Sequence, residues 1–238
     1  MTQDAYRQLL LTELDRSAEL RARAVEDAAF GERRARLRAW QAGRLARTHR
    51  DLLESRRFHA AAKFFLTDLY GPRDISRHVE EVRRIVPLMT SVLPDSGLAT
   101  VAHAMELNAL SESLDGAMVE KLGERTAEIT EALYSEAYRA VGRAGDRERQ
   151  IDLIALLGQA LDRLTHIRFI GLTLKVMRKP AELAGLGELQ AFLERGYAAF
   201  GEMRGGADEF VSIVVARERA ISGALFAGDD EALRREGG

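Results

Sequence analysis

The sequence predicts an all-α fold: a multi-helix bundle with long N-terminal helices, forming a hairpin or lying extended, and a central buried helix. Alanine, leucine, arginine and glutamate, which favour helices, dominate the chain, and its 238 residues include only four prolines. Apolar residues recur at spacings of three and four in most windows, and the two-residue alternation of strands is rare. Both patterns favour helices throughout.

The first two predicted helices span residues 3–30 and 32–69, and Gly31 marks the bend between them. On the second helix a residue recurs every seven positions, which predicts a packing seam. This stripe consists of Leu45, Leu52, His59 and Leu66. The segment FFLTDLYGPRD, residues 64–74, then predicts a helix stop at Tyr70, Gly71 and Pro72, followed by an N-cap at Asp74.

Further helices are predicted over residues 75–93, 98–122, 151–177, 186–203 and 207–226, and one more begins at Thr126 or Thr130 and ends at Val141. Asp146 caps the most apolar of them, 151–177, which we expect at the centre. Its part 167–176 also fits a strand, but no second strand is available to pair with it. We expect the long N-terminal helices (1–69) and a bundle core (70–228) to form one continuous domain, followed by a frayed tail (229–238).

Composition limits the classes of function. The formal net charge is -2, so no overall charge drives binding to nucleic acid or anionic lipid. The chain has no cysteine, and it shows no signal-peptide pattern and no apolar run long enough to span a bilayer. We expect a cytoplasmic protein with no membrane partner. The common catalytic and nucleotide-binding motifs are absent, and no cofactor is indicated.

Three groups of residues are candidates for a site. Arg56, His59 and Lys63 lie at helical spacing and, with His103, predict an anionic-ligand site, because arginine offers a planar fork of donors. The alternative is that their aliphatic stems shield the helix seam. His103 and Glu106 are three residues apart and form a candidate metal-ligand pair; a hydrogen-bonded histidine on a packing face is the alternative.

The third group is the basic segment 31–50, in which positive charges cluster around one tryptophan. Its candidate contacts to nucleic acid or an acidic partner are Arg33, Arg34, Arg38, Trp40, Arg44 and Arg47. The arginines are spread around the helix and lack further aromatic partners. A solvated helix paired with acidic neighbours is the alternative interpretation.

Four segments resemble a family of uncharacterised bacterial all-helical proteins. They are FFLTDLYGPRD (64–74), AMELNALSESLD (104–115), GDRERQIDLI (145–154) and AGLGELQAFLERGYAAF (184–200). The resemblance covers most of the chain beyond the basic segment. It implies a bacterial, wholly helical protein, and it brings no activity with it.

The sequence therefore favours a non-catalytic interaction or regulatory protein that binds itself or another protein through amphipathic helices. The absence of catalytic motifs and the long, charge-rich helix support this hypothesis. A second hypothesis is a helical bundle that binds a small anion, a metal or a cofactor, with or without enzymatic activity. A third is nucleic-acid binding through the arginine-rich helix.

Overall fold

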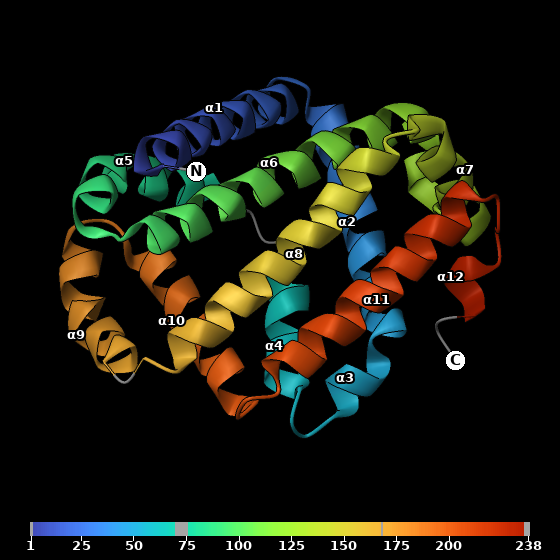
Figure 1. Cartoon of the computed structure of the whole chain (residues 1–238). Coiled ribbons are helices and arrows are strands. Elements are labelled where there is room, and N and C mark those ends of the chain that lie inside the picture. Colours follow the sequence, from blue (N-terminus) through green and yellow to red (C-terminus); the bar gives the residue numbers. More distant parts are fainter. Residues whose placement is uncertain (1, 70–75, 168, 236–238) are drawn as a thin grey trace.

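The computed structural model describes residues 2–69, 76–167 and 169–235, and it confirms the all-α prediction (Figure 1). Within these ranges the chain forms twelve α-helices, one π-helical turn and one 3-10 turn, and no strand. None of these helices is long and apolar enough to cross a bilayer. The elements are α1 (Gln3–Glu26), α2 (Ala28–Thr48), α3 (Arg50–Glu54), α4 (His59–Phe64), η1 (Phe65–Leu69), α5 (Ser76–Val92), α6 (Asp95–Leu122), η2 (Gly123–Glu128), α7 (Glu131–Val141), α8 (Ala144–Thr165), α9 (Ile170–Leu183), α10 (Gly187–Glu202), α11 (Ala207–Phe226) and α12 (Ala232–Arg235).

Two long helices organise the molecule. α6 packs along α1 on one side and contacts α2, α7 and α8 on others, so residues around most of its circumference are buried. α8 crosses α6 and lies beside α11, with α10 at its other end (Figure 1). α8 is thus central, as expected for the helix predicted to follow Asp146, and α6 is central as well. Helices apolar on more than one side are typical of such positions.

The break between the first two helices lies at Asp27, so the prediction of a bend at Gly31 is wrong. The side chain of Asp27 accepts a hydrogen bond from the Phe30 amide at 2.9 Å and caps α2. Gly31 lies within α2, where an added Cβ would come within 2.7 Å of the Ala24 carbonyl oxygen. The glycine allows α2 to turn tightly against the end of α1.

The predicted continuous helix 32–69 is also wrong. α2 ends at Thr48, the short α3 and α4 follow, and Phe65–Leu69 form a π-helical turn. Each break shifts the helical register, so the seven-residue stripe does not persist: Leu45 and Leu52 are buried, whereas His59 is exposed. The predicted stop at residues 70–72 and the cap at Asp74 lie outside the described residues.

The predicted helix 151–177 is two helices, because α8 ends at Thr165 and α9 begins at Ile170. The segment 170–176 is helical, as we expected over the strand alternative. α8 also begins before Asp146, which lies in its first turn and pairs with Arg143 at 2.6 Å. At the other end of the chain, the region expected to be a frayed tail contains α12, whose Ala232 and Leu233 are buried.

Candidate functional site: a central polar cavity

Five helices enclose a cavity of about 170 Å³ near the middle of the molecule. Each helix turns one stripe of side chains toward it. Its principal wall residues are Arg38, Gln41, Arg44 and Leu45 of α2; Asn108, Ser111 and Asp115 of α6; Tyr134 and Tyr138 of α7; Arg147, Gln150, Ile151 and Ile154 of α8; and Glu218, Ile221, Ser222 and Leu225 of α11. Asp68 of η1, Phe192 of α10 and Leu233 of α12 complete it. Polar and charged side chains outnumber apolar ones among these wall residues, so the cavity could orient a polar ligand group while apolar side chains cover the rest of the ligand.

Arg147 is the unusual member of this wall. It lies in the second turn of α8, and only 7% of its surface is exposed. Its guanidinium carbon lies 4.7 Å from the ring centroid of Tyr138, and its Nη1 donates to Gln150 Oε1 at 3.1 Å. Its Nη2 is buried without a hydrogen-bond partner. Among the described residues no carboxylate lies within ion-pairing distance of Arg147.

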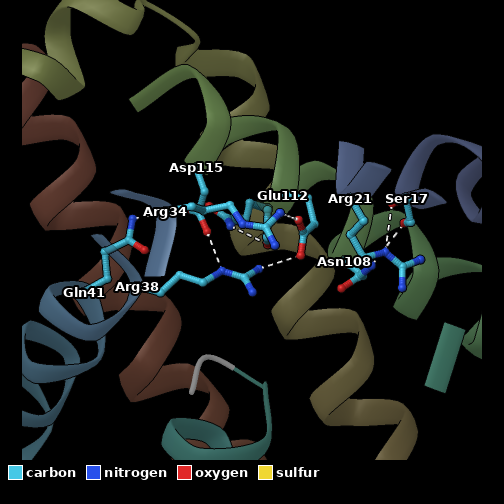
Figure 2. A network of polar contacts seen from close by, with 10 residues as sticks. Ser17, Arg21, Arg34, Arg38, Gln41, Asn108, Glu112 and Asp115 are labelled. Atoms are coloured by element: carbon cyan, nitrogen blue, oxygen red, sulfur yellow. Dashed lines mark hydrogen bonds and ion pairs between the residues drawn. The ribbon is translucent and has the colours of Figure 1, made fainter. Parts of the chain in front are cut away.

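A second arginine of the wall, Arg38, is fully paired. Figure 2 shows Arg34 and Arg38 converging on Glu112, with Asp115 one turn along α6. Arg38 donates to Glu112 at 2.7 Å and to Asp115 at 3.1 Å. Burial acts to lower the pKa of Arg38, but the two carboxylates outweigh it and raise that pKa. Gln41 completes the group by donating to Asp115 at 3.2 Å.

Arg44 is paired as well, on the side of the wall formed by α11. Its Nη1 donates to both oxygens of Glu218, at 2.6 and 2.8 Å, and the imidazole Nε2 of His49 lies 3.1 Å from the same carboxylate. Burial alone would raise the pKa of Glu218. The charge of Arg44 and the hydrogen bonds from His49 and Arg44 outweigh burial and lower that pKa to about 2.

The cavity therefore presents one uncompensated charge. Each carboxylate of its wall already holds an arginine other than Arg147: Asp115 holds Arg38, Glu218 holds Arg44, and Asp68 accepts from Arg195 at 2.6 Å. The neutral groups near Arg147 are also engaged, since Gln150 donates to Ser111 at 2.8 Å and Tyr138 bonds Ser222 at 2.9 Å. Arg147 thus lines the cavity with one guanidinium nitrogen, Nη2, that has no hydrogen-bond partner and with no carboxylate among the described residues to balance its charge.

The residues predicted as an anion site lie elsewhere. Arg56, His59 and Lys63 are exposed, and His59 Nδ1 lies 2.6 Å from the Leu53 carbonyl oxygen. The described polar and ring contacts of His103 are with Glu106 and with Tyr6, whose ring meets the imidazole edge-on at 5.9 Å. None of the four lines the cavity, and no described contact joins His103 to the other three.

The predicted metal pair does meet: His103 Nδ1 lies 3.1 Å from Glu106 Oε2. Glu106 also accepts two hydrogen bonds from Arg149, at 2.7 and 2.8 Å. Burial acts to raise the pKa of Glu106, but these hydrogen bonds from Arg149 and His103 lower it. In the described parts of the chain no three potential metal ligands gather into a group.

The arginines of the basic segment are engaged within the protein. Arg34, Arg38 and Arg44 turn inward to the carboxylates described above, and Arg33 and Arg47 pair with Glu124 at 2.7 Å and Glu131 at 3.6 Å. Trp40 stacks on Tyr134 with a centroid distance of 4.4 Å. This arrangement corresponds to the alternative interpretation, a helix paired with acidic neighbours.

The position of Arg147 in a cavity was not predicted from the sequence. A signal was present. Ile151 and Ile154 follow Arg147 at spacings of four and seven, so a charged residue lies on the apolar face of its helix. On α6 the polar residues Asn108, Ser111 and Asp115 likewise share one face at spacings of three and four. Polar side chains on inner faces of helices that meet predict a polar cavity.

A family model described as a domain of unknown function (DUF8198) matches residues 20–232. The chain belongs to this family. The matched region contains all the cavity residues named above except Leu233. Comparisons with curated proteins and with solved structures gave no match.

Proposed function

We propose that the protein binds a small anionic ligand in the central cavity, with Arg147 as its counter-charge. The buried, unpaired guanidinium of Arg147 is the observation that carries the proposal. Burying a charge without a partner is costly, so buried charges are normally paired. A bound anion supplies the partner that no described residue provides.

The surroundings of Arg147 suit this role. The ring of Tyr138 supports one face of the guanidinium, and Gln150 holds Nη1, so the group is oriented before a ligand arrives. Guanidinium groups bind carboxylates and phosphates through parallel N–H donors. The proposal is one of binding, and it involves no catalytic step. It corresponds to the second hypothesis from the sequence, at a different set of residues.

Native mass spectrometry of the untagged protein tests this function. We expect a small, stoichiometric added mass that is lost on denaturation. The variant Arg147→Met should lack it. Arg149→Met is the matched control, because Arg149 lies on the same helix but pairs with Glu106 outside the cavity. A wild-type protein that carries no added mass and shows no thermal shift with small organic anions would contradict the proposal.

A second observation favours the hypothesis of self-association. α9 lies at the outer edge of the molecule (Figure 1). It carries apolar residues on two opposite faces. Its inner face meets α10, where Gln190 donates to the Leu174 carbonyl at 2.6 Å and Ala181 is buried. The opposite face, the α9 stripe, consists of Phe169, Leu172, Val176 and Leu183, which are 60–91% exposed.

We propose that the α9 stripe pairs with the α9 stripe of a second copy of the chain. Its spacing of three, four and seven is that of a helix seam. Lys175 and Glu182 flank one side of it, are exposed and make no ion pair with a described residue. Antiparallel pairing brings equal flanks together, and a two-fold axis between residues 178 and 179 places Lys175 of each copy near Glu182 of the other. The charges are therefore complementary.

Sedimentation equilibrium over a wide concentration range tests this pairing. We expect a monomer–dimer equilibrium that Leu172→Glu abolishes. Val25→Glu is the control, because Val25 is an apolar residue of α1 that is 83% exposed outside the α9 stripe. A wild-type chain that stays monomeric at every concentration, or a dimer unaffected by Leu172→Glu, would contradict self-pairing through the α9 stripe.

A further inference from the structure

We infer that the ligand of the central cavity is a monocarboxylate with a short apolar body, about the size of hexanoate or benzoate. This inference rests on the proposed function and narrows the chemistry of its ligand. The charge of the wall, the donors of Arg147, the apolar residues beside it and the cavity volume each limit the ligand in a different way.

The charge of the wall favours a single negative charge. Arg147 is the one arginine of the described wall without a carboxylate, whereas Asp115 and Glu218 face the same cavity. A dianion would bring a second charge close to these carboxylates, away from water, where repulsion between like charges is strong. Phosphate monoesters and dicarboxylates are disfavoured for this reason.

The hydrogen-bond donors available at Arg147 also favour a carboxylate over a phosphate. Nη1 of Arg147 already donates to Gln150, and Nη2 is the buried nitrogen that lacks a partner. The amide of Gln150 donates to Ser111 and is not free. A phosphate has three oxygens that need donors when water is excluded. With Nη2 as the one unpaired nitrogen, a carboxylate with two oxygens leaves fewer acceptors without a donor than a phosphate with three.

The apolar body of the ligand follows the inner face of α8. Ile151 and Ile154 line the cavity four and seven residues beyond Arg147, with Phe192 and Leu107 on facing helices. At 1.5 Å per residue, Ile154 lies about 10 Å along the helix from Arg147. A carboxylate held at Arg147 can therefore extend an alkyl or aryl group over these side chains.

The cavity volume sets the size of that body. The cavity holds about 170 Å³. An apolar cavity of about 150 Å³ binds benzene in a well-studied protein. A six-carbon chain or one aromatic ring with its carboxylate matches this space, and longer fatty acids exceed it.

Calorimetric titration of the wild-type protein, after removal of any bound mass, tests the inference with four six-carbon probes. The probes are hexanoate, hexanol, hexyl phosphate and adipate. Hexanoate should bind at least about tenfold more tightly than hexanol, the ratio expected for one charge-assisted hydrogen bond. Hexyl phosphate and adipate should bind more weakly than hexanoate. The Arg147→Met variant should lose the preference for hexanoate over hexanol, while Arg149→Met keeps it.

The outcomes separate this inference from the proposed function. Tighter binding of hexyl phosphate or adipate than of hexanoate would overturn the monocarboxylate and leave an anion site at Arg147. Equal binding of hexanol and hexanoate would overturn the role of the charge and with it both proposals. The comparison among probes uses the wild-type chain, so it holds even if Arg147→Met fails to fold.

Discussion

Gly158 of α8 lies directly against Val211 of α11, and a Cβ added to the glycine would lie 2.4 Å from Val211 Cγ2. The two helices thus approach at a point where one has no side chain. These helices also carry Arg147 and Glu218, on different parts of the cavity wall. The two closely packed helices thus each contribute a charged side chain to the cavity wall.

Gly158→Ala should destabilise the protein by about 1–3 kcal/mol, the usual effect of overpacking a core. Val211 is β-branched and buried, so it cannot turn away from the new methyl group. Urea denaturation measures the loss. Gly145→Ala is the control: Gly145 is in the same helix with open space around it, and the substitution should be neutral or stabilising. The double variant Gly158→Ala/Val211→Ala should recover stability; if it does not, steric contact is the wrong explanation.

Two buried arginines of the same cavity should respond oppositely to methionine. Arg44→Met leaves Glu218 buried with only His49 beside it and should lower the free energy of unfolding by about 3–5 kcal/mol. Arg147→Met removes a charge that has no carboxylate partner, so the ligand-free protein should lose less than about 1 kcal/mol or gain stability. Thermal and urea unfolding of ligand-free samples measures both. A loss at Arg147 as large as that at Arg44 would indicate a hidden partner for Arg147.

The Arg44–Glu218 pair should also make the free energy of unfolding depend on pH under acidic conditions. Because the pKa of Glu218 is about 2 in the folded protein and 4.5 is its ordinary value, the pair stabilises the fold fully above about pH 4.5. This contribution is lost progressively as the pH falls from about 4.5 to about 2. Glu218→Gln should make the decline of stability in this window shallower than in the wild type, as measured by urea unfolding at several pH values. Glu202→Gln, at an exposed residue without a described ion pair, should leave the slope unchanged.

The α9 stripe has a charged residue, Lys179, at its edge. Lys179 lies at the edge of the stripe between Val176 and Leu183, and a polar residue at a seam position lowers the stability of helix pairing. Lys179→Leu should therefore tighten the dimer at least about tenfold, corresponding to burial of one leucine side chain. Sedimentation equilibrium measures the shift. An unchanged or weakened dimer would place the contact elsewhere on the surface.

The fold class followed from helix-forming composition and from spacing, and the helices 98–122, 186–203 and 207–226 were predicted closely. The breaks within the predicted helices 32–69 and 151–177 were missed, because these breaks contain no proline. The bend at Ser55–Phe58 is held by tertiary contacts that intrinsic propensity does not encode: Arg57 donates to the Met203 carbonyl, and Phe58 packs against Phe210. Asp27, by contrast, is an ordinary N-cap residue that could have been recognised.

The cavity was less accessible to prediction than the fold. Spacing within one helix shows that Arg147 shares a face with Ile151, but it cannot show which other helices meet that face. The partners of Arg38 and Arg44 lie more than 70 residues away along the chain. Whether an inward arginine has a carboxylate partner therefore depends on α6 and α11. Only the folded structure shows that Arg38 and Arg44 have such partners and that Arg147 has none among the described residues.

The short helix α12 touches the cavity through Leu233. Four residues are too few to form a stable helix by themselves, so α12 depends on the core beneath it for its order. Whatever fills the cavity supports one wall of that core. The backbone amides of α12 are thus a natural reporter of occupancy: their hydrogen exchange slows when the ligand is bound and quickens when it leaves, without any label on the site itself.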